Sequence, residues 1–203
     1  MNLQKLILPI VTFALLLFTA TNFATAQAAE AKPAEATYEA VLHVLIAGGQ
    51  AGESVPSSLS AVSRSIRSEF DTSNLRLINT YFGRLSNTGS IEYKGVSNAY
   101  AEESMPGAPS FLDWRLVGIR SIQNALGQAA YHLQSFRFGA RVPVRVVNFP
   151  DEKTPAPVNY ESIGLTVERV NVRDNAPTLI GTLTQPRTDG TLFLVLTIRN
   201  ADK

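Results

Sequence analysis

Three arginines recur at every fourth position of one predicted strand, and their spacing could serve the binding of anions. Arg137, Arg141 and Arg145 alternate with apolar residues within Phe136–Val147, so their guanidinium groups line one face of the strand while the other face is buried. A guanidinium group binds phosphate or carboxylate through paired hydrogen bonds. Acidic side chains on a neighbouring strand would instead neutralise the row, and the near-neutral composition favours this pairing.

Pro143 lies in the same predicted strand and indicates an edge or a bulge. Proline has no N–H group to donate to a neighbouring strand, so it is confined to such positions. An open strand edge accepts a strand from another chain. The predicted interaction or anion surface therefore consists of Arg137, Arg141, Pro143 and Arg145.

The chain has two histidines, His43 and His132, which fall in predicted strands far apart in sequence. Because the sequence has no cysteine, a zinc site would need carboxylates as its remaining ligands. The hydrolase patterns G-x-S-x-G and H-E-x-x-H are also absent. We expect no catalytic residue, no metal site and no enzymatic activity. A hydrolase in which His132 converges with acidic side chains is the alternative that a structure can test.

The glycine-rich stretch Gly48–Ser54 lies between a predicted strand and a predicted helix, where phosphate-binding loops occur. It has neither the Lys-Ser/Thr ending of a Walker loop nor the G-x-G-x-x-G spacing of a dinucleotide site. The acidic pairs Glu102-Glu103 and Asp151-Glu152 are sequence neighbours in loops, whereas a glycosidase needs two carboxylates across a cleft. We therefore expect no cofactor.

Residues 1–28 have the pattern of a signal peptide, with Lys5 before an apolar run and Ala26-Gln27-Ala28 as the cleavage site. This predicts an exported protein in the periplasm or at the outer membrane, with no transmembrane segment in the mature chain. Its 18 basic residues become 17 after Lys5 is removed, against 17 acidic ones. The basic surplus of a general nucleic-acid binder is missing, so we expect no nucleic-acid partner.

The hydrophobic pattern predicts an α+β fold dominated by antiparallel strands. We expect a flexible leader at 29–37, a small β-α-β-β unit at 38–100, a linker at 101–109 and an antiparallel β-meander or sandwich-like domain at 110–203. The helix is predicted over Val55–Phe70, and Ser86–Gly89 is predicted to join two strands as a hairpin. The remaining predicted strands are Tyr38–Ala47, Leu75–Leu85, Ser90–Val96, Phe111–Ile122, Ala129–Val147, Tyr160–Val172, Thr178–Leu183 and Thr191–Arg199.

Short segments of the second half resemble the C-terminal β-domain of bacterial secretins, the multimeric outer-membrane channels of secretion and pilus systems. The resemblance runs from residue 139 to residue 198 and is carried by Gly139–Val144, Val158–Leu165, Val170–Asn175, Leu179–Leu183 and Leu194–Thr197. The membrane-spanning and gate segments of that family are absent between these pieces. The resemblance therefore implies a soluble relative or accessory protein with no catalytic residues.

These observations predict a non-enzymatic envelope protein that acts as an assembly component, such as a secretin-like accessory protein in a secretion or pilus system. Its partners would be other envelope proteins or further copies of itself. The alternative is a periplasmic binding module that uses the arginine-lined face for an anionic lipid or glycan.

Overall fold

The computed structural model describes residues 35–48, 52–98, 100, 108–145, 158–186 and 190–202. The predicted signal peptide and most of the predicted leader and linker lie outside these residues. Residues 35–203 form one compact unit. Within the described part of the chain, none of the helices has the length and apolar character needed to cross a membrane.

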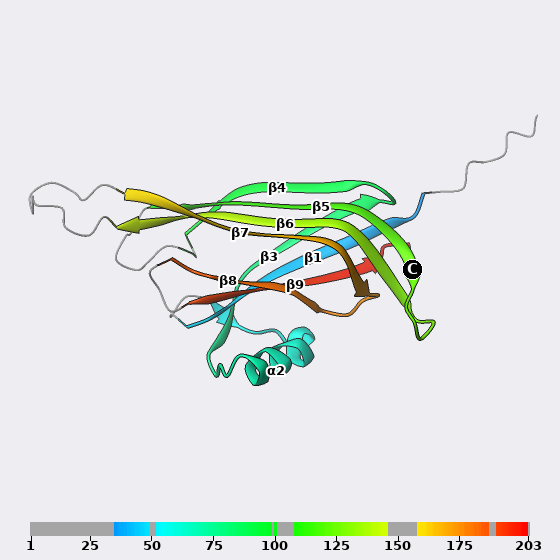
Figure 1. The fold of residues 1–203 in the computed structure, drawn as a ribbon, viewed down its shortest axis with the longest axis horizontal. Coiled ribbons are helices and arrows are strands. Elements are labelled where there is room, and N and C mark those ends of the chain that lie inside the picture. The colour runs from blue at the N-terminus through cyan, green and yellow to red at the C-terminus, as the bar shows by residue number, and fades with distance from the viewer. Residues whose placement is uncertain are drawn as a thin grey trace, which may run out of the picture. The chain divides into compact units, whose positions relative to one another are not determined.

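Two antiparallel sheets make up the fold, and they confirm the predicted β-dominated α+β class. The first sheet has the strand order β2-β3-β1-β9-β8, and the second has the order β4-β5-β6-β7 (Figure 1). The elements of the described residues are β1 (Thr37–Ala47), β2 (Glu53–Ser54), the 3-10 helix η1 (Ser57–Leu59), α2 (Ser60–Glu69), β3 (Leu75–Ser86), β4 (Ser90–Ser97), β5 (Ser110–Gln123), β6 (Ala129–Arg145), β7 (Val158–Arg173), β8 (Thr178–Thr184) and β9 (Thr191–Asn200).

Both halves of the chain contribute to both sheets. The first strand, β1, pairs along its whole length with the last, β9, and β4 pairs with β5. The two predicted units at 38–100 and 110–203 therefore share one core. The strands β4, β5, β6 and β7 follow one another as antiparallel neighbours and form a four-stranded meander, and the chain returns to the first sheet after β7.

The predicted hairpin at Ser86–Gly89 is wrong, because β3 and β4 belong to different sheets. The turn carries the chain across the edge of the fold. The side chain of Ile91 lies over Gly83, so that a Cβ placed on Gly83 would be 2.9 Å from the Ile91 Cδ1. On the other edge Leu165 of β7 lies over Gly181 of β8 in the same way. At both places an aliphatic side chain, rather than a ladder of hydrogen bonds, joins the two sheets.

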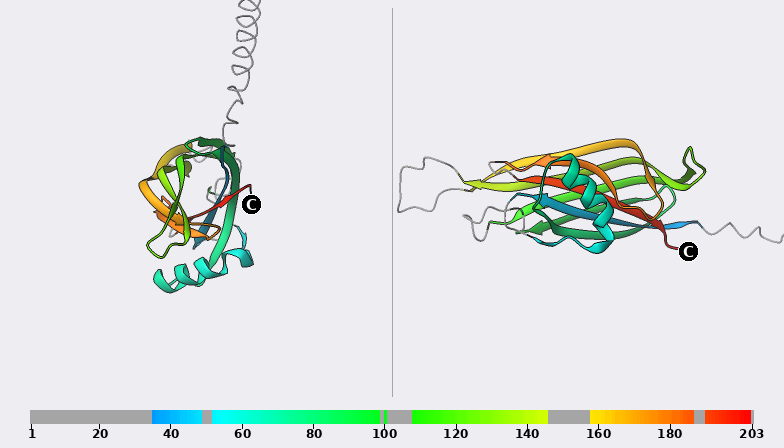
Figure 2. Two further views of the ribbon diagram at one scale, coloured as in Figure 1. Left: turned by 90° about the vertical axis from the view of Figure 1, so that its right-hand side faces the viewer. Right: turned by 90° about the horizontal axis from the view of Figure 1, so that it is seen from below.

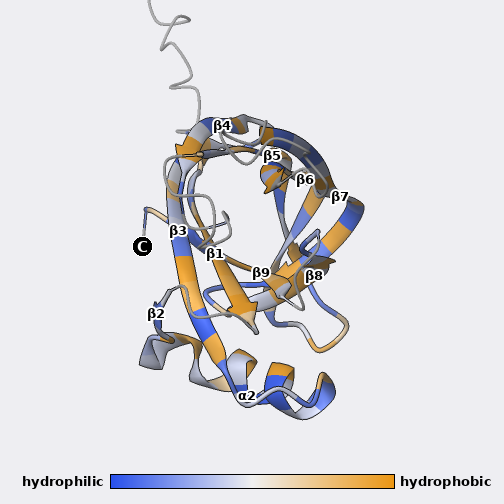
Figure 3. Ribbon diagram, turned by 90° about the vertical axis from the view of Figure 1, so that its left-hand side faces the viewer, coloured by the Kyte–Doolittle hydropathy of each residue, from blue (hydrophilic) through white to orange (hydrophobic). Residues whose placement is uncertain are grey.

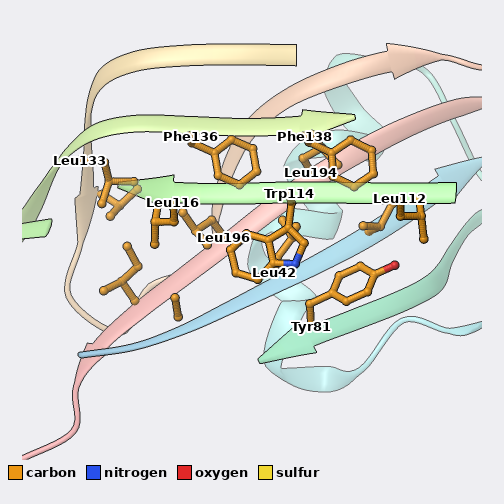
Figure 4. Close-up of a cluster of buried hydrophobic side chains, with 14 of the residues drawn as sticks. Leu42, Tyr81, Leu112, Trp114, Leu116, Leu133, Phe136, Phe138, Leu194 and Leu196 are labelled. Carbon is orange, nitrogen blue, oxygen red and sulfur yellow. The ribbon is translucent and has the colours of Figure 1, made fainter. Parts of the chain in front are cut away.

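The main core lies between the inner faces of the two sheets. The apolar side of Phe136–Val142 is buried there as predicted, and Trp114 is 1% exposed. Figure 4 shows Trp114 of β5 among Leu42 of β1 and Leu194 and Leu196 of β9. The residues of β6 alternate between apolar and polar because one face of the strand packs against this core and the other face lies outside it.

A second apolar cluster attaches the helix to the outer face of the five-stranded sheet. Leu59 and Ile66 are buried against Leu45 of β1 and Phe193 of β9. The helix lies outside the sheets, below β1 and β3 in the end-on view (Figure 3) and across the strands in the second panel of Figure 2. It covers one end of this face, so β1 is buried on both sides at Leu45 but not along its whole length.

The four-stranded sheet bends along a line that crosses three strands. Gly118 and Arg169 have φ angles of 65° and 54°, and both stand beside Gln134 in the register of the sheet. The alternation of faces shifts at this line, so Ile119 rather than residue 118 faces the core. Strict alternation along β5 would place Ile122 on the face of Trp114, but because of this shift Ile122 is not among the core residues. Glycine suits position 118 because a positive φ costs it little.

Candidate interaction surface

The outer face of the four-stranded sheet holds the predicted arginines. Arg137 and Arg141 are both exposed and come from β6. Their neighbours follow from the strand register, which forms three cross-strand rows. From β4 to β7 these rows are Glu92, Arg115, Arg137 and Thr166; then Lys94, Asp113, Gly139 and Gly164; then Val96, Phe111, Arg141 and Ser162.

Arg137 has an acidic neighbour, as the pairing interpretation requires. Its Nε atom lies 3.9 Å from Oδ2 of Asp113. The Asp113 carboxylate extends over Gly139, where a Cβ would lie 2.7 Å from its Oδ1. Glycine at this position therefore leaves room for the acid. On the neighbouring strand, Lys94 lies 2.8 Å from Glu92, and its hydrogen bond lowers the pKa of that carboxyl group.

Arg141 packs on an aromatic ring. Its Cζ atom lies 5.0 Å from the ring centroid of Phe111, which is within the range of a cation–π interaction. The Phe111 ring is in turn 5.5 Å from that of Tyr160 on β7. The two arginines that the structure describes in full thus have different environments, one acidic and one aromatic.

Two hollows on this face share Asp113, Arg137 and Arg141. One, of about 610 Å³, lies over β4 and β5, and the other, of about 460 Å³, lies over β6 and β7. Gly139 and Gly164 are direct register partners and form the floor of the second hollow. The missing side chains of this glycine pair leave room on the sheet surface between the two arginines, and the Asp113 carboxylate occupies part of it over Gly139.

Pro143 lies where β6 extends past β5. The register between β5 and β6 ends with Phe111 opposite Arg141, whereas the register between β6 and β7 continues to Arg145 opposite Val158. Within the part of the chain that the structure describes, residues 142–145 therefore have a registered neighbour on one side only. The two-stranded extension is roughly 13 Å long at 3.3 Å per residue. Pro143 itself is buried. Of Arg145 the structure describes only the backbone.

Four exposed apolar side chains gather at this same end of the outer face, a feature that sequence reasoning missed. They belong to β4, β5 and β7, and their exposed fractions are 61% for Val96, 37% for Phe111, 43% for Val158 and 40% for Tyr160. We call these four residues the apolar end. Because they come from three strands, only the register brings them together.

The two histidines are separate and make ordinary hydrogen bonds. Nδ1 of His43 lies 3.0 Å from Oγ1 of Thr80, and Nδ1 of His132 lies 2.8 Å from Oδ1 of Asn171. His132 thus contacts an amide, not a carboxylate. No group of three histidine, aspartate or glutamate side chains suitable for a metal occurs among the described residues. Residues 49–51 of the glycine-rich stretch and both acidic pairs lie outside them.

Sequence reasoning also missed a buried carboxylate at the centre of the five-stranded sheet. Glu39 of β1 is 5% exposed and lies between Arg84 of β3 and Arg199 of β9. Arg84 donates from Nε at 2.9 Å to Oε1, and Arg199 donates from Nε at 2.6 Å to Oε2. The hydrogen bond from Arg84 first, then that from Arg199, lowers the pKa of Glu39. We call these three residues the Glu39 clamp.

Comparison with known proteins gives a weak resemblance to secretins. No family model matches the sequence, and no curated protein matches it. Among solved structures, the Salmonella SPI-1 type III secretion injectisome secretin InvG is 10% identical, with a TM-score of 0.34 over 95% of this chain and 69% of that one. The InvG secretin domain β-barrel is 11% identical, with a TM-score of 0.30 over 94% of this chain and 67% of that one. A basal-body structure of InvG with PrgH and PrgK gives a TM-score of 0.34 at 10% identity, over 95% of this chain and 49% of the matched chain.

Proposed function

We propose that this protein is a non-enzymatic, exported component of the cell envelope that assembles with other proteins or with further copies of itself. The observation that carries the proposal is the end of the four-stranded sheet, where, among the described residues, β6 and β7 extend past β5 and the apolar end lies beside them. An open edge offers unpaired backbone donors and acceptors to another strand. Exposed apolar side chains beside it supply the area that a partner would bury.

The sequence supports the same assignment. The predicted signal peptide directs the chain out of the cytoplasm, and the common hydrolase patterns are absent. The segments between residues 139 and 198 resemble the β-domain of secretins, which assemble into multimers. A secretin-like accessory protein of a secretion or pilus system, periplasmic or bound at the outer membrane, is the specific form of the proposal.

Crosslinking tests the proposed interface. A photoreactive residue in place of Tyr160 should form a defined crosslinked product in cells, because this side chain lies in the apolar end beside the extension of β6 and β7. The matched control is Leu126, which is also apolar and exposed but lies in the turn between β5 and β6, at the opposite end of the sheet. The double variant Val158→Lys/Tyr160→Lys should weaken the complex at least about tenfold. Equal crosslinking from both positions, or only monomer from both, would contradict the proposal.

The two hollows favour a second candidate function, a binding module for an anionic envelope ligand. Here Arg137 and Arg141 would contact the anionic groups on either side of the glycine floor. The variant Arg137→Gln/Arg141→Gln should then lose most of its retention on anionic lipid vesicles or an acidic polysaccharide, with an unchanged unfolding midpoint. Arg120→Gln/Arg173→Gln makes the same change of charge at exposed positions of β5 and β7 that line neither hollow. Equal retention of the two double variants would exclude this function.

A further inference from the structure

A separate hollow lies on the outer face of the five-stranded sheet, on the part that the helix leaves uncovered. Its volume is about 300 Å³. Four segments far apart in the sequence form it: β1, η1, the turn between β7 and β8, and β9. The lining residues that matter for binding are Val41, His43, Leu59, Asn175, Thr197 and Arg199.

The wall of this hollow includes one guanidinium group, that of Arg199, which shares its carboxylate partner with a second arginine. Arg199 belongs to the Glu39 clamp, in which two guanidinium groups share one carboxylate, so the clamp as a whole has a formal charge of +1. Arg199 contacts Oε2 of Glu39 through Nε at 2.6 Å and Nη2 at 2.5 Å. Arg84 contacts the other oxygen, Oε1, through Nε and Nη2. The two arginines thus have equivalent roles toward Glu39, but only Arg199 is among the residues that line the hollow.

The rest of the lining combines apolar surface with neutral polar groups. Val41 is half-buried and Leu59 is buried, so together they offer an apolar wall. His43 uses Nδ1 toward Thr80, and burial lowers the pKa of its imidazole, which favours the neutral ring. The Asn175 amide and the Thr197 hydroxyl can each donate and accept a hydrogen bond. A cation, a few neutral polar groups and an apolar wall match a ligand with one anionic end.

We propose that this hollow binds a small monocarboxylate with a short apolar chain. The carboxylate contacts the guanidinium group of Arg199, and the apolar chain lies against Val41 and Leu59. A volume of about 300 Å³ is at the lower limit of ligand pockets, so the ligand is small. One arginine in the wall suits a single carboxylate better than a phosphate dianion. The site lies on the other sheet from the apolar end and does not depend on the proposed assembly.

A titration with three ligands of one shape tests the proposal. Isovalerate, isovaleramide and isoamylamine share the same branched chain and differ in the polar end, which is an anion, a neutral amide and a cation respectively. In ¹H–¹⁵N spectra of the mature protein, isovalerate should shift the resonances of His43, Thr197 and Asn175 with a dissociation constant on the order of 1 mM. The amide and the amine should cause at least about tenfold weaker shifts. No shift with isovalerate, or equal shifts with the amide, would overturn the proposal.

The Glu39 clamp provides a matched pair of variants. Arg199→Gln and Arg84→Gln each remove one guanidinium group from Glu39, so their effects on folding should be similar. Only Arg199→Gln should abolish the isovalerate shifts, because Arg84 is not part of the wall. If Arg199→Gln does not fold, Val41→Trp, at a half-buried position of the wall, fills the hollow from the apolar side and should block binding with the clamp intact. Equal binding by the wild type and by every folded variant, or equal loss in both arginine variants, would show that Arg199 does not hold the ligand.

Discussion

Replacing Trp114 by alanine should lower the free energy of unfolding by about 3–5 kcal/mol, which is the range for the loss of a large aromatic side chain from a core. The side chain is 1% exposed and lies where β5 faces β1 and β9 (Figure 4). Its ring is 6.4 Å from that of Tyr81 on β3, so it also contacts the edge of the five-stranded sheet. The cavity left by alanine would lie between the two sheets, where few side chains can move to fill it. Denaturant unfolding followed by far-UV circular dichroism measures the effect.

Two control variants separate the loss of packing from other effects. The indole Nε1 of Trp114 is buried and has no hydrogen-bond partner among the described residues. Trp114→Phe keeps most of the packing and removes this unsatisfied donor, so its cost should stay within about 1.5 kcal/mol. Phe111→Ala, three positions earlier on the exposed face of the same strand, should cost less than Trp114→Ala. If the Phe111 variant were the less stable of the two, the assignment of the inner face of β5 would be incorrect.

Sequence reasoning succeeded where the signal is local. The alternation of Phe136–Val144 depends on residues within one strand, and β6 occurs there as predicted. The helix predicted over Val55–Phe70 occurs as η1 followed directly by α2, with Leu59 in the first and Ile66 in the second. The side of the strand that is buried follows from the same pattern. Local periodicity therefore identified the strands, the helix and the fold class.

Prediction from the sequence failed for those features that depend on which strands are neighbours in the sheets. The turn Ser86–Gly89 has the same residues whether it closes a hairpin or crosses between sheets. The packing of Ile91 over Gly83 accompanies the crossing that the structure has. The shift of faces at Gly118 depends likewise on the bend shared with Gln134 and Arg169. No single-strand pattern contains this information.

The candidate sites were even harder to predict from the sequence, because their residues come from different strands. Arg137 and Arg141 could be placed on one face from their spacing, but the Asp113 and Phe111 that contact them come from another strand. The Glu39 clamp joins residues 45 and 160 positions apart. One signal was available for it: Glu39 is an acidic residue inside an otherwise apolar central strand, and buried carboxylates require partners.

Glu39→Gln should destabilise the protein at neutral pH, and the difference from the wild type should disappear in acid. The physical reason is that Arg84 and Arg199 stabilise the ionised carboxylate and hold the pKa of Glu39 below its usual value. A lowered pKa in the folded state means that this stabilisation is fully present above the pKa of the unfolded chain, about 4.3. It is lost as the pH falls through the lower pKa of the folded state. In the variant, the two guanidinium groups face a neutral amide at every pH.

Denaturant unfolding of both proteins at neutral pH and at several values below 4 measures this dependence. The wild type should lose stability on acidification more steeply than Glu39→Gln, so that the two curves converge. Glu69→Gln, at the exposed end of α2, is the matched control and should follow the wild-type curve. A constant difference between the wild type and Glu39→Gln across this range would mean that the carboxylate acts through its shape and not its charge.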